Sequence, residues 1–217
     1  PGASGRFLVA DEVGLGKTMI ARGVIAKAID LLREKQIPQI DVIYICSNGD
    51  IARQNINRLK VADEEHIPLV SRLTLLPREL ARLKKTNGGV NFISFTPTTS
   101  FELHSGLGRA DERILLYWML RKAWGFGNGK ASMNVFQGTS GADRFRQSLE
   151  RFAPECISDV SHQDFRDALE KHAGLRERFE SLCDAYSHSH RVVSAETSSE
   201  RYRFIGELRT ILAASCV

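Results

Sequence analysis

The stretch RFLVADEVGLGKTMIARGVIAKAID, residues 6–30, decides the expected fold of this chain of 217 residues. Its first part, RFLVA, is a short apolar run typical of a buried strand, and it leads directly into a glycine-rich turn. From Lys17 to about Glu34 apolar residues recur at three- and four-residue steps, which predicts a helix. The recurring residues are Ile20, Val24, Ala28 and Leu31. A strand, a glycine-rich turn and a helix in this order are the context that a phosphate-binding loop requires.

The turn itself has the composition of a phosphate cradle. Gly14 and Gly16 allow the backbone to curl so that successive N–H groups point at phosphate oxygens, and the helix that follows adds its positive end. Lys17 is expected to reach the β- and γ-phosphates, and the Thr18 hydroxyl to bind Mg²⁺. The predicted ATP site, with Lys17 as its catalytic residue, comprises Asp11, Glu12, Val13, Gly14, Leu15, Gly16, Lys17 and Thr18. The alternative is a glycine turn that only joins strand to helix, and Asp11 does stand where the strict GxxxxGK[ST] pattern has glycine.

Beyond this helix the chain alternates between strand and helix patterns. DVIYIC at 41–46 and VNFISF at 90–95 are predicted strands, RLTLL at 72–76 is a possible short strand, and IARQNINRL at 51–59 is a predicted helix. Such an alternation is typical of a parallel sheet with crossover helices.

After about residue 100 no strand pattern returns. Amphipathic helices are predicted at residues 109–124, 142–152, 162–186 and 198–216. Glycine- and serine-rich joints, 125–132 and 137–141, separate some of them. The second half is therefore expected to be mostly helical.

Three segments of the first half resemble helicase motifs. FLVADEVGLGKT, 7–18, is similar to motif I of superfamily-two helicases and is closest to the Swi/Snf-type branch with its DE-x-GLGKT signature. CSNGDIARQNINRL, 46–59, looks like motif Ia of that group, and NFISFTPTTSF, 91–101, resembles the strand and TPxT turn of motif Ib. The resemblance implies an α/β fold: a P-loop NTPase (RecA-like) parallel sheet, incomplete, in residues 1–101, and a mostly helical insertion in residues 102–217 that leads towards a DExx strand.

The resemblance also implies contacts between these motifs and a nucleic acid backbone. The expected contact residues are Ser47, Asn48, Arg53, Gln54, Thr96, Thr98 and Thr99. These are polar donors at the carboxyl ends of predicted strands, which suits them to phosphate oxygens. The alternative is ordinary capping and turn chemistry, with Asn48 or Asp50 as a helix N-cap and Thr96-Pro97 as the end of a strand.

ATP hydrolysis also needs a carboxylate that follows a buried strand and holds Mg²⁺. No Asp-Glu pair meets this requirement: Asp11-Glu12 lies in the loop, Asp63-Glu64 in a polar segment, and Asp111-Glu112 at the start of a predicted helix. The chain is therefore expected to be a fragment that ends before the DExx box and that binds ATP without hydrolysing it alone.

The leading functional interpretation is the ATP-binding part of an ATP-dependent DNA or RNA helicase or translocase. Its expected partners are a nucleic acid, DNA in preference to RNA, and the remainder of the helicase motor. A nucleotide-dependent protein-interaction module and a decayed gene fragment stay open as alternatives. A small-molecule kinase shares the loop, but its lid arginines and substrate carboxylates cannot be assigned here.

The composition agrees with a protein that is not embedded in a membrane. No apolar run reaches the 18 or more residues of a membrane span, and four scattered cysteines without a CxxC pair favour a reduced, cytoplasmic setting. The net charge is +4, and the excess of basic residues lies in residues 1–95. Its densest cluster is Arg72, Arg78, Arg82, Lys84 and Lys85, which is either a solvated helix face or a phosphate contact.

Two further patterns are interpreted as structural. Cys183 with His188 and His190 lacks the second cysteine pair of a zinc site, so metal binding is not expected. The aromatic and aliphatic residues Leu115, Leu116, Trp118, Met119 and Trp124 are expected to pack in a core or interface.

Overall fold

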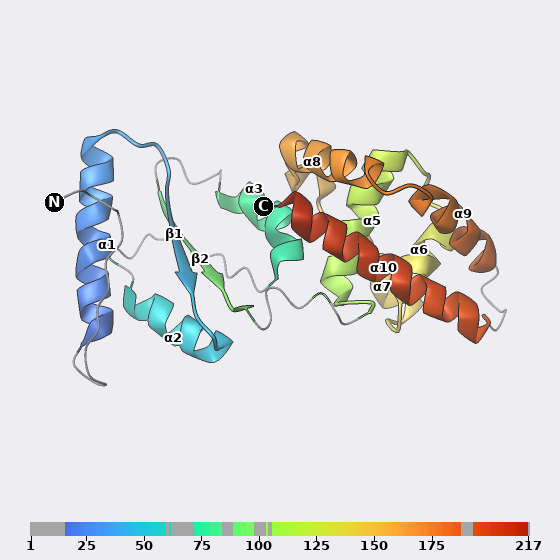
Figure 1. Cartoon of the computed structure of the whole chain (residues 1–217), viewed down its shortest axis with the longest axis horizontal. Coiled ribbons are helices and arrows are strands. Elements are labelled where there is room, and N and C mark those ends of the chain that lie inside the picture. Colours follow the sequence, from blue (N-terminus) through green and yellow to red (C-terminus); the bar gives the residue numbers. More distant parts are fainter. Residues whose placement is uncertain are drawn as a thin grey trace. The chain divides into compact units, whose positions relative to one another are not determined.

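The structure is a computed structural model, and it describes residues 16–59, 61, 72–83, 89–97, 103, 106–187 and 193–216. The protein is mixed α/β and mostly helical, and its described residues form one small parallel sheet (Figure 1). The described elements divide into two compact units. The first unit contains helices α1 and α2 and both strands, and the second contains α3 and every helix from α5 onward.

The sheet of the first unit consists of β1 (Ile40–Ile45) and β2 (Val90–Phe95), which pair in parallel. The register places Ile40 opposite Val90 and Ile45 opposite Phe95. Both strands are rich in β-branched and aromatic residues, which suit a pleated, buried surface. The strands predicted at 41–46 and 90–95 are therefore confirmed, the first with a shift of one residue. The strand predicted at residues 6–10 lies outside the described residues.

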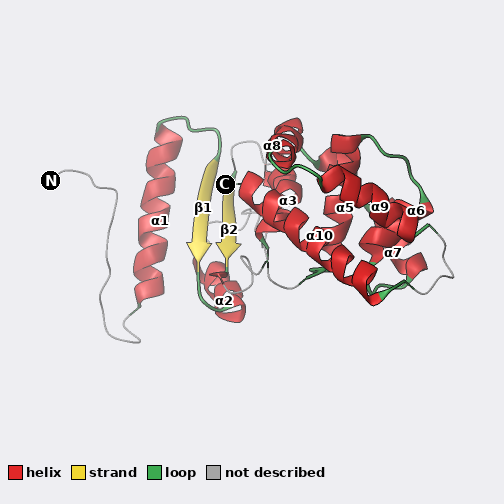
Figure 2. Cartoon of the chain, turned by 45° about the vertical axis from the view of Figure 1, so that its right-hand side comes forward, coloured by secondary structure: helices red, strands yellow, loops and turns green. Residues whose placement is uncertain are grey.

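Helices α1 (Lys17–Glu34) and α2 (Gly49–Leu59) pack against each other and against this sheet (Figure 2). The buried residues of this core are Ile29, Ile40, Ile56, Leu59, Val90 and Phe92. The predicted helix from Lys17 is confirmed over its full length, whereas α2 begins two residues before the predicted start.

Helix α1 buries a different stripe from the one that its sequence periodicity marks. The residues on its core side are Ala21, Ile25, Ile29 and Leu32. Ile20, Val24 and Leu31 are 41%, 52% and 47% exposed. The helix thus has two apolar stripes, and the periodicity of the sequence identified the helix but not its buried face.

Strand β1 likewise has one apolar face in solvent. Ile43 and Ile45 are 60% and 67% exposed, while Val42 and Tyr44 on the other face pack against the core. Nearly continuous apolar runs are typical of parallel strands that are covered on both faces. Among the described residues only one face of β1 is well covered.

The possible strand at residues 72–76 is wrong. This segment forms a 3-10 turn, η1 (Leu73–Leu75), followed by helix α3 (Leu76–Leu83), and both belong to the second unit. Pro77 lies in the first turn of α3, where its missing N–H costs no hydrogen bond. Leu75 is buried in the core of the second unit, so burial against helices, not strand pairing, decides its conformation.

Every described secondary-structure element of the second unit is a helix. Its elements after α3 are α5 (Ala110–Trp124), α6 (Lys130–Gln137), α7 (Ala142–Arg151), η2 (Pro154–Cys156), α8 (Asp159–Glu170), α9 (Leu175–Ala185) and α10 (Ala195–Ser215). The helices predicted at 109–124, 142–152 and 198–216 are confirmed with small shifts at their ends.

The helix predicted at 162–186 is two helices. Gly174 adopts the left-handed conformation with φ of 79° and is the N-cap residue of α9, so the chain turns between α8 and α9. Ser158 caps α8 by accepting a hydrogen bond from the Ser161 amide at 3.1 Å, which places the start of α8 three residues before the predicted start. A single glycine in the left-handed region therefore divides a pattern that was continuous in sequence.

Helix α6 was not predicted. Its first residues, Lys130 to Ser132, fall in the predicted joint, but Val135 and Phe136 are fully buried. The helix is only 8 residues long, too short for a clear periodicity in sequence.

The core of the second unit forms around α5 and α10. Leu115, Leu116 and Met119 have no exposed surface, and Trp118 and Trp124 pack against the same core, as expected for that apolar face. No helix in the described part of the chain is long and apolar enough to cross a membrane.

A buried ion pair lies within this core. The Glu112 carboxylate accepts hydrogen bonds from Arg209 Nε at 3.2 Å and Nη2 at 3.1 Å, and neither side chain is exposed. The same carboxylate accepts bonds from Thr74 Oγ1 at 2.6 Å and from the Arg109 amide at 2.7 Å, and Arg72 Nη1 lies 3.5 Å away. The pair therefore links η1, the start of α5 and α10.

Candidate functional site

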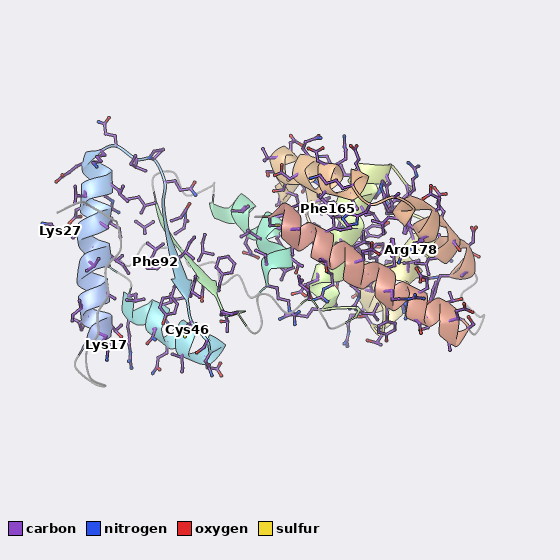
Figure 3. The ribbon with its side chains drawn as sticks, in the orientation of Figure 1. Lys17, Lys27, Cys46, Phe92, Phe165 and Arg178 are labelled. Carbon is purple, nitrogen blue, oxygen red and sulfur yellow. The ribbon has the colours of Figure 1, made fainter. Side chains whose placement is uncertain are left out.

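The described part of the predicted phosphate loop is the start of α1. Lys17 and Thr18 are its first two residues, and both are partly buried. The amino end of α1 lies at the same end of the first unit as the carboxyl ends of β1 and β2, as the positions of Lys17 and Cys46 show (Figure 3). Ligands of open α/β sheets bind at this end of the strands.

Gly16 has the backbone conformation that a glycine-rich loop requires at this point. Its φ and ψ are 79° and 24°, the left-handed region, and its carbonyl accepts the first helical bonds, from the Met19 amide at 2.8 Å and the Ile20 amide at 3.1 Å. No side chain caps the helix through this residue, and the first turn contains no acidic side chain. The positive end of α1 is thus not neutralised by its own first turn, which is the condition under which a helix end attracts an anion.

The other predicted loop residues, Asp11, Glu12, Val13, Gly14 and Leu15, lie outside the described residues. Their predicted contacts with ATP remain predictions, and so does the binding of Mg²⁺ by Thr18.

The structure brings the first residues after both strands together. The Cys46 amide donates to the Phe95 carbonyl at 3.1 Å, which continues the sheet by one residue. A Cβ added at Gly49 would lie 3.8 Å from Thr96 Oγ1, so the start of α2 and the end of β2 are neighbours. Ser47, Asn48 and Thr96, predicted from two separate motifs, therefore share one edge of the sheet.

Asn48 has the capping role that was considered as its alternative. Its Oδ1 accepts hydrogen bonds from the Asp50 amide at 2.9 Å and the Ile51 amide at 3.2 Å, and its carbonyl accepts from Ala52 at 2.9 Å. Asn48 is therefore the N-cap of α2, and its side-chain oxygen is used within the protein.

The remaining predicted nucleic-acid contacts differ in exposure. Ser47 and Gln54 are exposed and available to a ligand, whereas Thr96 is 7% exposed. Thr98, Thr99 and the side chain of Arg53 lie outside the described residues. Ser47 and Gln54 thus remain the described candidates for backbone contact.

No described acidic pair supplies the carboxylate that hydrolysis needs. Asp111 and Glu112 open α5, as expected, and both carboxylates are used there. Asp111 forms an ion pair with Arg109 at 3.1 Å, and Glu112 pairs with Arg209.

The described residues contain no group of three or more His, Cys, Asp or Glu side chains that could hold a metal ion. All four cysteines are free thiols. Burial raises the pKa of the Cys183 and Cys216 thiols to about 11, which keeps them protonated at neutral pH. His188 and His190 lie outside the described residues.

The second unit contains a hollow that was not predicted from the sequence. This α5–α8 hollow has a volume of about 630 Å³, and its principal lining residues are Trp118, Arg121, Lys122, Phe126, Ile157 and His162. The signal was present in WMLRKAWGF, residues 118–126, where aromatic and basic residues alternate at short spacing. The sequence favoured packing over a ligand-binding role for the face that includes Trp118, and the Trp118 ring also forms part of this hollow.

Burial controls the charge of the histidine in the hollow. His162 is 6% exposed, and desolvation, assisted by the nearby charge of Lys122, lowers its pKa to about 4. The imidazole is therefore neutral at neutral pH and presents one donor and one acceptor.

Comparison of the chain with protein-family models, with curated proteins and with solved structures gave no significant match.

Proposed function

We propose that this chain is the nucleotide-binding part of an ATP-dependent helicase or translocase that acts on a nucleic acid. The observation that carries the proposal is the start of α1: the Gly16-Lys17-Thr18 sequence opens a helix behind a left-handed glycine, at the carboxyl end of a parallel sheet. This is the position at which P-loop proteins bind phosphate groups.

The described residues fit a Mg²⁺-bound triphosphate. The amino end of α1 offers backbone donors and a positive helix end, Lys17 supplies a charged donor, and Thr18 a hydroxyl ligand for Mg²⁺. Bound Mg·ATP supplies the phosphoryl group whose cleavage drives such a motor. The role of this chain is to hold the phosphate tail and to neutralise its charge.

The polar edge beside the two strands supports the nucleic-acid part of the proposal. Ser47 is exposed at this edge and Gln54 is exposed on α2, and both belong to the segment that resembles motif Ia. Asn48 caps the start of α2, and Thr96 lies next to that start. ATP binding without turnover is proposed for the chain alone, because Asp111 and Glu112 are both engaged in ion pairs.

Calorimetry with Mg·ATP tests the proposal directly. We expect the chain to bind, and Lys17→Ala to weaken binding by at least about tenfold, because a charged hydrogen bond to phosphate is lost. Lys27→Ala is the matched control, because Lys27 is an exposed lysine on the same helix (Figure 3). Equal affinities for a folded Lys17→Ala variant and for the unaltered chain would contradict the proposal.

A nucleotide-dependent interaction module is the second candidate. The observation that favours it is the closed core of the helical unit, which buries residues from α5 to α10 independently of the sheet. In that case ATP affinity would depend on Lys17 while the chain showed no affinity for DNA or RNA at low salt.

A further inference from the structure

The α5–α8 hollow has the size and lining of a ligand site. Its volume of about 630 Å³ falls within the usual range for sites that hold small molecules. Helix α5 and the turn after it form one wall of the hollow, and η2 with α8 form the other wall. Helices α5 and α8 pack against each other (Figure 1). All these elements belong to the second unit, so the site does not depend on the nucleotide-binding unit.

The walls are apolar and partly aromatic. Trp118, Phe126 and Ile157 contribute rings and an aliphatic surface to the hollow. The Phe126 ring is held in place by Phe179, with ring centroids 4.8 Å apart, and by Tyr117 at 5.6 Å. A wall that is fixed from behind can receive a flat ring without rearrangement, which lowers the entropic cost of binding.

Arg121 is a cation that lies over the Trp118 ring of this wall. Its guanidinium carbon lies 5.0 Å from the centre of the Trp118 ring, and its Nε donates to the Phe126 carbonyl at 3.3 Å. Among the described residues no carboxylate forms an ion pair with Arg121. Its terminal nitrogens are suited to an external anion, which a guanidinium binds in a bidentate manner.

The other charges of the hollow direct a negative group to Arg121. Lys122 is paired with Asp159 at 2.8 Å, so these two charges compensate each other. His162 is neutral at neutral pH because of its burial. Glu155 lies on the η2 side and repels an anion from that wall, so Arg121 is the cation left for an anionic ligand.

We propose that the α5–α8 hollow binds one nucleotide unit of a single-stranded nucleic acid, with its base against Trp118 and Phe126 and its phosphate at Arg121. A flat ring joined to one anionic group matches an aromatic wall that ends in an arginine, and bases stack on such walls without regard to sequence. The hollow is open to solvent, so the rest of a strand can lie outside it. The proposal rests on the proposed function for the kind of partner, and it adds a second contact site, on the helical unit.

Anisotropy of a labelled oligothymidylate of about 12 nucleotides, measured with the full chain in the absence of ATP, tests the site. We expect Arg121→Gln and Trp118→Leu each to weaken binding by about tenfold, because one phosphate contact or one stacking contact is lost. We also expect Arg121→Gln to reduce the slope of log K against log salt by about 0.7, the value for one phosphate on a single strand. Bound strand should in addition quench the fluorescence of Trp118.

Matched control variants distinguish a loss of binding at the hollow from a general effect of altered charge or of misfolding. Arg176→Gln removes an exposed arginine of α9 that is paired with Glu180, and Trp124→Phe changes the tryptophan that does not line the hollow. Both should bind within about twofold of the unaltered chain, since neither contacts the ligand. Circular dichroism of every variant establishes that the chain is folded.

Three outcomes would overturn the proposal. The first is strand affinity that stays unchanged in folded Arg121→Gln and Trp118→Leu variants. The second is thymidine monophosphate competing as well as the strand on a per-nucleotide basis, which would identify a free nucleotide as the ligand. The third is the absence of strand binding at low salt. Because ATP is absent from this assay, failure here is distinct from a failure of ATP binding at Lys17.

Discussion

The side chains of Glu112 and Arg209 have no exposed surface and face each other in the core of the helical unit. Removing two charges from water costs several kcal/mol for each, and their mutual attraction compensates only when the hydrogen bonds are satisfied. The Glu112 carboxylate also accepts hydrogen bonds from the Thr74 hydroxyl and the Arg109 amide, and it pairs with the Arg72 guanidinium. Gly108 belongs to the same arrangement, because a Cβ there would lie 2.7 Å from Arg209 Cζ.

Glu112→Gln is therefore expected to lower the free energy of unfolding by about 3–5 kcal/mol, because it leaves the Arg209 charge buried without a counterion. Urea denaturation monitored by fluorescence measures this loss. The double variant Glu112→Leu with Arg209→Met should recover most of the stability, since neither charge of the pair then remains buried. A loss below about 1 kcal/mol for Glu112→Gln would show that water reaches the pair.

The buried His162 predicts a dependence of stability on pH. Its pKa is about 4 in the folded chain, against 6.5 ordinarily, mainly because of burial and then because of the charge of Lys122. Between these values the unfolded chain binds a proton that the folded chain does not bind. The contribution of His162 to the free energy of unfolding is therefore complete above about pH 6.5. It falls by up to about 3 kcal/mol as the pH decreases to 4.

The comparison of His162→Gln with the unaltered chain isolates this contribution. The variant keeps a neutral polar side chain, so the difference in unfolding free energy between the two proteins should change between pH 6.5 and 4. His172, which lies on the surface near Glu207 at 3.7 Å, serves as the control position. A difference that does not vary with pH would contradict a lowered pKa at His162.

At the scale of elements, the apolar residues of a helix or strand are not all buried. Strand β1 leaves Ile43 and Ile45 largely exposed, whereas Phe92 of β2 is fully buried. Ile43→Thr combined with Ile45→Thr should therefore change the unfolding free energy by less than about 1 kcal/mol, and Phe92→Ala should cost about 3–5 kcal/mol.

The same pair of substitutions should reduce self-association of the chain, because exposed apolar side chains on a strand at the edge of the described sheet promote pairing with other chains. Light scattering at increasing protein concentration measures this effect. A large loss of stability in the double threonine variant would instead show that the exposed face of β1 is covered in solution.

Sequence patterns were sufficient for the longer elements and insufficient for features that depend on tertiary contacts. Helix α1 and both described strands were predicted closely, because their periodicity or β-branched composition extends over the whole element. The RLTLL segment was misassigned, because burial of Leu75 among helices overrides a short apolar run. The break at Gly174 depends on one backbone conformation, which a helical pattern does not reveal.

The candidate site likewise has parts that were predicted from the sequence and parts that were not. The start of α1 was predicted from the sequence, whereas the shared edge of Ser47 and Thr96 was found in the structure and follows from the parallel pairing of β1 and β2. The α5–α8 hollow could not be predicted, because it forms between helices that are separated by more than 30 residues.

At the scale of the whole molecule, the order of elements along the chain differs from their grouping in space. Helix α3 lies between α2 and β2 in sequence, yet it belongs to the helical unit. Leu75, 6% exposed, packs in the core of that unit, and Thr74 and Arg72 contact Glu112. Residues that sequence analysis assigned to the first domain thus stabilise the second unit.

Leu75→Ala is expected to destabilise the helical unit by about 2–5 kcal/mol, because it opens a cavity in that core. Both tryptophans, Trp118 and Trp124, lie in this unit, so their fluorescence reports its unfolding selectively. Arg78→Ala, at a more exposed position in the adjoining helix α3, is the control and should have little effect. An unchanged fluorescence transition for Leu75→Ala would place η1 outside the cooperative unit.

The insertion of α3 also decides what a protease can release. The polypeptide enters the helical unit after α2, returns to the sheet with β2, and leaves it again after Phe95. A single cut in any one of these connections leaves at least one fragment that still spans both units. The two fragments are therefore expected to co-purify under native conditions. Only cleavage of all three connections frees an intact helical body, which then consists of two polypeptides held together around the carboxylate of Glu112.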